Sequence, residues 1–188
     1  MSRGQILNVL EDALPADRIR RIESESGLAD SEMRRAFVWS VSERYKIPQS
    51  DWLNVLGKAD FFLACPGTEM PLCHNLVESL SQGVVPILEH PEFLDPPLQH
   101  GVNCLVFQGR DELVSTLNKV FELEPEEIKR LRAGAYAYYR EYLAPGSFAN
   151  RLVTASQSRV DLLWDAYRAR KSEVSGPKSE VSGPKSEV

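Results

Sequence analysis

The sequence has few cysteines, no long apolar run and no dense basic cluster, and each absence excludes a class of function. The three cysteines among 188 residues are odd in number and form no CxxC pair, so we expect neither a disulfide framework nor a metal site. Every apolar run is shorter than the roughly 18 residues of a membrane-spanning helix. With a formal net charge of -5, nucleic acid is not an expected partner.

Two further absences bear on location and ligand class. The start, MSRGQILNVLEDALP, lacks the basic, apolar and small-residue succession of a signal peptide, which predicts a cytoplasmic protein. Neither GxGxxG nor GxxxxGK[ST] occurs, so the common dinucleotide and P-loop sites are not indicated. The hydrophobic content of 43% is enough for a soluble globular domain with a core.

Three regions are distinguished along the chain. Residues 1–48 form a segment in which apolar residues recur at four-residue spacing, which predicts helices; the residues are Ile6, Leu10, Leu14, Met33, Phe37, Val41 and Tyr45. The stretch AFVWSV within it is also compatible with a strand. Residues 172–188 repeat a unit rich in Ser, Gly, Pro and Lys, and we expect them to be a disordered tail because they have no apolar face to bury.

Residues 49–171 read as an α/β domain. A short helix, SDWLNVLGK, with Ser50 or Asp51 as its N-cap, is followed by the unbroken apolar runs ADFFLAC, VVPIL and NCLVF. Such runs are typical of strands covered on both faces, as in parallel sheets. We therefore predict a Rossmann-like small parallel sheet flanked by helices.

Long helices are expected to close this domain. Asp111 is a candidate cap for the first, Pro125 suits the first turn of the second, and the third is expected to begin at Ser147. The tyrosines and Trp164 are expected to serve helix packing. Cys65 and Cys104 are interpreted as small core hydrophobes.

The segment after ADFFLAC is the candidate site. In open parallel sheets, ligands bind outside the carboxyl ends of strands, where PGTEMPLC follows here. Gly67 allows the backbone to approach a ligand closely. A helix that begins near Leu72 would direct unpaired N–H groups toward a phosphate, and Gly83 would end it.

Polar side chains share one face of that helix. His74 and Glu78 are four residues apart, and Asn75 and Glu78 three apart, while Leu76 and Leu80 point toward a core. A carboxylate accepts two hydrogen bonds at once, which suits the 2′ and 3′ hydroxyls of a ribose. The spacing alone is equally compatible with a solvated helix face.

Three successive segments together resemble the C-terminal, nucleotide-sugar-binding half of GT-B-fold glycosyltransferases, particularly exostosin-like and related families. They are ADFFLACPG, CHNLVESLSQGVVPI and HGVNCLVF. The resemblance covers about residues 50 to 145. It implies that Glu78 holds the donor ribose, whereas Pro66, Gly67 and Thr68 form the loop near the diphosphate and sugar. Proline is usual in this strand of the family, where Pro86 stands here.

Some features depart from the family pattern. His74 and Asn75 lie where the family has a basic or polar residue near the phosphates, often Arg, so either protonated His74 supplies the charge or donor binding is weaker. Some retaining members have a second Glu eight positions before the first; Met70 stands there, and Glu69 is out of register. No catalytic residue is assigned, and no cofactor is implied.

The resemblance implies a donor domain that transfers a sugar from a nucleotide-diphosphate sugar, such as a UDP- or GDP-sugar, to a hydroxyl acceptor. A GT-B enzyme also needs a second domain, which residues 1–48 are too few to supply. A missing acceptor domain or partner chain is therefore expected. The alternatives are a non-enzymatic interaction module with a vestigial pocket and, ranked last, a flavodoxin-like or phosphate-binding α/β protein.

Overall fold

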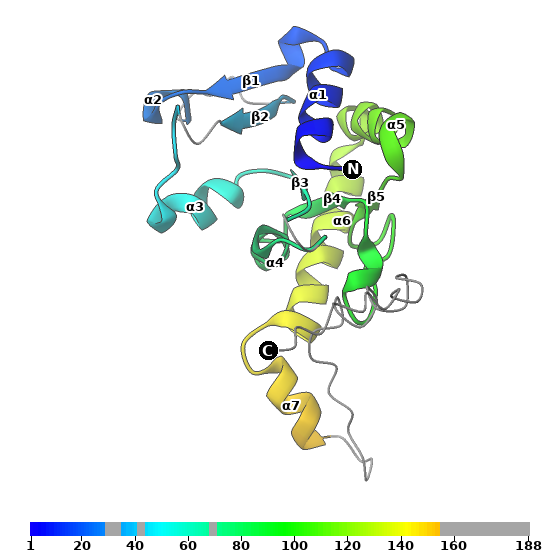
Figure 1. Cartoon of the computed structure of the whole chain (residues 1–188). Coiled ribbons are helices and arrows are strands. Elements are labelled where there is room, and N and C mark those ends of the chain that lie inside the picture. Colours follow the sequence, from blue (N-terminus) through cyan, green and yellow to red (C-terminus); the bar gives the residue numbers. More distant parts are fainter. Residues whose placement is uncertain (29–34, 41–43, 68–70, 155–188) are drawn as a thin grey trace, which may run out of the picture. The chain divides into compact units, whose positions relative to one another are not determined.

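A computed structural model describes residues 1–28, 35–40, 44–67 and 71–154, which contain two small parallel sheets flanked by helices (Figure 1). In the first, β1 (Ile19–Ile22) pairs with β2 (Phe37–Ser40). In the second, β4 (Val85–Leu88) lies between β3 (Phe61–Leu63) and β5 (Leu105–Val106). The expected α/β class, with small parallel sheets and flanking helices, is confirmed.

The second sheet arises from the three apolar runs. Phe61 lies opposite Val85, and Ile87 lies opposite Leu105. All four residues of β4 are buried, as expected for a central strand with helices on both faces. The strands are shorter than the runs that predicted them, because the ends of each run turn into loops.

The expectation of a mostly helical segment over residues 1–48 is wrong in part. The first helix, α1 (Arg3–Ala13), is present and begins with a capping box formed by Ser2 and Gln5. Phe37–Ser40, however, is strand β2 rather than helix. Aromatic and β-branched side chains favour a strand when a partner is present, and β1 supplies that partner. Met33 and Val41, which also supported the helix, lie outside the described residues.

Six helices besides α1 are described. They are α2 (Glu25–Leu28), α3 (Gln49–Leu56), α4 (His74–Ser81), α5 (Gly109–Glu122), α6 (Pro125–Tyr138) and α7 (Ser147–Thr154). Shorter 3₁₀ turns occur at Ala16–Arg18 and Pro91–Phe93, and a π-helical turn at Tyr139–Leu143 continues α6. Among the described residues, no helix has the length and apolar character required to span a bilayer.

Helix starts agree only in part with the sequence signals. Pro125 begins α6 and Ser147 begins α7, as predicted. The N-cap of α3 is Pro48 rather than Ser50 or Asp51, which both lie inside the first turn; there the Ser50 hydroxyl donates to the Asp51 carboxylate. Asp111 lies inside the first turn of α5, which begins two residues earlier at Gly109, and there its charge still favours the positive end of the helix.

The second sheet separates two apolar clusters. One cluster joins α1, α5 and Leu131 of α6 to one face of the sheet; its other fully buried members include Ile6, Val85, Phe107 and Leu113. The other joins α4 and α6 to the opposite face; it includes Leu76, Leu80, Leu88, Cys104 and Ala135. Neighbouring residues of β4 contribute to different clusters because side chains alternate along a strand. The tail, 172–188, lies outside the described residues.

Candidate functional site

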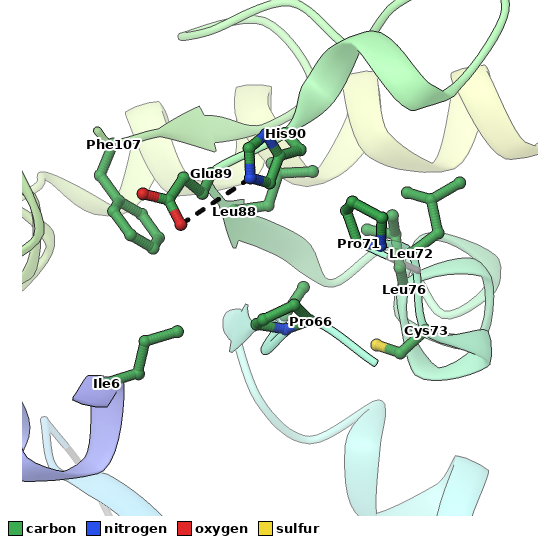
Figure 2. A pocket seen from close by; sticks show the side chains of 11 residues that line it. Ile6, Pro66, Pro71, Leu72, Cys73, Leu76, Leu88, Glu89, His90 and Phe107 are labelled. Carbon is green, nitrogen blue, oxygen red and sulfur yellow. Dashed lines mark ion pairs between the residues drawn. The ribbon is translucent and has the colours of Figure 1, made fainter. Parts of the chain in front are cut away.

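A small cavity of about 10 Å³, room for about one water molecule, lies at the carboxyl ends of the strands of the second sheet (Figure 2). We call it the strand-end cavity. Its lining comes from the ends of β3, β4 and β5, from the start of α4 and from α1: Ile6, Ala64, Pro66, Pro71, Leu72, Cys73, Leu76, Leu88, Glu89, His90 and Phe107. This is the position at which open parallel sheets bind ligands.

Glu89 and His90 are polar residues in an otherwise largely apolar lining. The Glu89 carboxylate accepts hydrogen bonds from the Gly109 amide, at 3.2 Å, and from the α-amino group of Met1. Burial by itself raises the pKa of Glu89, but these two hydrogen bonds, together with the charges of the α-amino group and of His90, hold the pKa below its usual value. His90 Nε2 lies 3.9 Å from Glu89, and its Nδ1 lies 3.2 Å from the Glu92 carboxylate.

The loop predicted to lie near the diphosphate is only partly in the cavity lining. Pro66 lines the cavity, and the following Gly67 is half-buried outside the lining. Thr68, also predicted for this loop, lies outside the described residues. Pro71, Leu72 and Cys73 also line the cavity (Figure 2).

Helix α4 presents its start to this cavity. It begins at His74, two residues later than expected, after the extended N-cap residue Cys73. Among the described residues, no side chain caps it. The Leu76 amide donates to the Cys73 carbonyl at 3.0 Å, which leaves the amides of the preceding residues as candidate donors to an anion. His74 is exposed and Asn75 half-buried. Gly83 follows the helix with φ 63°, the left-handed conformation expected after a helix end.

Glu78 points to α3 and does not line the cavity. Its Oε2 accepts a hydrogen bond of 2.7 Å from Trp52 Nε1. Trp52 in turn packs edge-to-face on Phe62, with 6.4 Å between ring centroids. In the part of the chain that the structure describes, Oε1 of Glu78 has no hydrogen-bond partner. The carboxylate is thus half-buried, positioned by Trp52, and left with one acceptor oxygen.

The interior-facing residues of α4 behave as predicted. Leu76 and Leu80 are buried in the cluster shared with α6. Ser79, also buried, donates its hydroxyl to the Leu76 carbonyl. The packing therefore fixes which side of α4 faces the core, and Glu78 is left at the contact with α3.

Sequence reasoning missed the cavity residues Ile6, Glu89, His90 and Phe107. Glu89 and His90 come directly after the apolar run VVPIL, so polar residues at a strand's carboxyl end were an available signal. No sequence signal indicated Ile6, because its position depends on how α1 packs against β3 to β5. In the described ranges, no group of three or more His, Cys, Asp or Glu side chains is arranged to hold a metal ion.

The cysteines differ in their surroundings. Burial raises the pKa of Cys104 to about 12. Burial also raises the pKa of Cys65, although the charge of Arg3 partly opposes this shift. Cys73 is half-buried at the cavity.

We predict that Cys104 does not react with iodoacetamide in the native protein at pH 8, because only the thiolate is nucleophilic. Cys73 should react under the same conditions, and all three cysteines should react in concentrated urea. Peptide mass spectrometry after timed labelling measures each rate, with Cys73→Ser as the control. Equal labelling of Cys104 in native and unfolded protein would contradict its burial.

Comparison with family models, with curated proteins and with solved structures finds no match to this chain.

Proposed function

We propose that the chain is a donor-binding domain of a glycosyltransferase, which binds a nucleotide-diphosphate sugar along α4, beside the strand-end cavity, for transfer to a hydroxyl acceptor. The observation that carries the proposal is the half-buried Glu78 carboxylate, which keeps one acceptor oxygen on the helix whose uncapped start borders the cavity. The Rossmann-like character of the sheet is part of this proposal.

The arrangement supports a ligand whose phosphate and ribose groups bind at different positions along α4. Phosphate groups would bind near the first amides of the helix, where the dipole favours negative charge. The ribose would lie about one turn further on, since His74 and Glu78 are separated by four residues. There, Glu78 Oε1 would accept from a ribose hydroxyl while Oε2 remains bonded to Trp52.

Such a domain contributes to catalysis mainly by positioning the donor. Amide groups at the cavity would hold the diphosphate leaving group and stabilise its charge as the bond to the sugar breaks. No described residue is assigned as a catalytic base, which in this proposal comes from an acceptor domain or partner chain. The isolated chain is therefore expected to bind donor without turning it over.

Glu78→Gln should abolish most UDP or GDP binding and leave the fold intact. Trp52 Nε1 is a donor only, so the new amide must turn its oxygen toward Trp52 and its NH₂ toward the ribose site. That NH₂ cannot accept a hydroxyl hydrogen bond. We expect at least a tenfold rise in the Kd, measured by isothermal titration calorimetry.

Glu122→Ala is the matched control, because Glu122 is an exposed acid in the last turn of α5. It should bind nucleotide as the unmodified chain does. Binding by Glu78→Gln at the unmodified affinity would disprove the assignment of Glu78. If neither UDP nor GDP binds the unmodified chain at millimolar concentration, the proposed function is wrong.

A non-enzymatic interaction module is the second candidate. Two observations favour it: Glu78 lies outside the cavity lining, and Leu53 on α3 and Val77 on α4 are 41% and 37% exposed. Thermal stability separates the candidates, because a ligand at 100 times its Kd stabilises the folded state by about 2.7 kcal/mol. No shift with UDP, GDP or their sugar conjugates would favour the module.

A further inference from the structure

The outer edge of the second sheet is formed by β5. In the part of the chain that the structure describes, β5 pairs with β4 only, and the Phe107 amide just after it donates to the Leu88 carbonyl of β4. Neighbouring residues of a strand direct their amides to opposite edges, so the Val106 amide faces away from β4. An uncovered edge amide of this kind is available to pair with another strand.

The turn before β5, residues 99–103, covers this edge with two hydrogen bonds. The Gly101 amide donates to the Cys104 carbonyl at 2.8 Å. The Val106 amide donates to Nδ1 of His100 at 2.9 Å. The imidazole therefore occupies the position that the carbonyl of a neighbouring strand would take.

The contact with Val106 fixes the protonation state of His100. A backbone amide only donates, so Nδ1 is the acceptor and the neutral ring carries its proton on Nε2. A protonated imidazole has donors only and cannot accept from Val106. Because histidine changes its charge between about pH 5 and 8, this hydrogen bond is lost as the pH falls through that range.

The surroundings of His100 provide no compensation for a positive charge. The residue is exposed, and among the described residues no carboxylate forms an ion pair with it. The charged side chain recorded at this turn is a cation: Arg130 of α6 donates to the Gly101 carbonyl at 2.9 Å, and its own partner, Glu127, lies 3.8 Å from it. Protonation of His100 therefore adds a second positive charge to the turn and removes the contact with Val106.

We propose that His100 is a pH switch at the outer edge of the second sheet. Neutral His100 holds the turn against β5 through the Val106 amide, and protonated His100 releases that amide and exposes the edge. The hydrogen bond contributes to stability above the titration range of His100 and is lost as the pH falls through it. Neither residue lines the strand-end cavity, so the switch is independent of the proposed function.

The test is amide hydrogen exchange of the full chain, followed residue by residue by NMR at pH 8 and at pH 5. Rates are compared as protection factors, because the intrinsic exchange rate itself changes with pH. The protection factor of Val106 should fall about tenfold from pH 8 to pH 5, whereas that of Phe107, which donates to a carbonyl, should not. The nitrogen chemical shifts of the His100 ring should show a proton on Nε2 alone at pH 8 and on both nitrogens at pH 5.

Two substitutions separate the switch from a general effect of acid. His100→Asn provides an amide oxygen as the acceptor, which does not titrate, so the pH dependence of Val106 protection should disappear. His100→Ala provides no acceptor, and Val106 protection should be low at both pH values. His74→Asn is the matched control, because His74 is an exposed histidine at the start of α4 and its removal should leave the pH dependence of Val106 unchanged.

Two results would overturn the assignment. One is equal protection of Val106 at pH 8 and pH 5 in the unmodified chain. The other is a pH dependence in His100→Asn as large as that of the unmodified chain, since the titrating group would then lie elsewhere.

Discussion

Gly134→Ala is expected to destabilise the protein by about 3 kcal/mol, although Ala normally stabilises a helix by about 1 kcal/mol relative to Gly. Gly134 lies in the interior of α6, where the helix crosses the loop before β5. A Cβ at this position would overlap the carbonyl oxygen of Val102 and lie 3.1 Å from its carbonyl carbon. Both are backbone atoms, so no side-chain rotation relieves the overlap.

The loop that contains Val102 also contacts α6 at a second point. Arg130, one turn before Gly134, donates to the Gly101 carbonyl at 2.9 Å. Moving the loop away from α6 would strain this hydrogen bond and the buried Cys104 beyond it. The destabilisation therefore reflects two helix–loop contacts rather than one.

Gly4→Ala is the control, since a Cβ on Gly4 in α1 meets nothing within 4 Å. It should leave stability unchanged or raise it by up to about 1 kcal/mol. Urea unfolding followed by circular dichroism gives the free energy of unfolding for both variants. Equal effects of the two substitutions would show that α6 does not approach Val102 as described.

The parts of the fold that were predictable rest on local signals. Unbroken apolar runs indicated β3, β4 and β5, and Pro125 and Gly83 marked a helix start and a helix end. These signals work because they reflect burial on both faces of a strand or the allowed backbone angles of one residue.

The β1–β2 pair was not predictable in the same way. Phe37 and Val41 are four residues apart and fit a helical period, yet Phe37–Ser40 pairs in parallel with Ile19–Ile22. The pairing partner lies outside any local window. A short apolar stretch therefore takes its structure from tertiary contact rather than from its own spacing.

The candidate site was likewise predictable only where local signals exist. The loop and helix were locatable because they follow a buried strand, and Pro66 does line the cavity. The hydrogen bond between Trp52 and Glu78 could not be predicted, since it joins residues of two helices that are 26 positions apart in sequence. The contributions of α1 and of Glu89 likewise depend on how the helix is packed over the sheet.

Phe107→Ala is expected to lower the free energy of unfolding by about 3 to 5 kcal/mol. Phe107 is 0% exposed, directly follows β5 and belongs to the cluster under α1 and α5. Its amide donates to the Leu88 carbonyl at 3.1 Å, so the backbone holds the emptied position and limits collapse around it. Because domains are typically stable by only 5–15 kcal/mol, this single change removes a large share of stability.

Phe107 also forms a wall of the strand-end cavity, so its removal tests packing and site together. Phe107→Leu should cost about 1 kcal/mol and retain nucleotide affinity, whereas Phe107→Ala should enlarge the cavity and weaken binding even under conditions in which the variant remains folded. Leu53→Ala, at a 41% exposed position on α3, should change stability by less than either. A loss below about 1 kcal/mol for Phe107→Ala would mean that the sheet, α1 and α5 do not share one packed core.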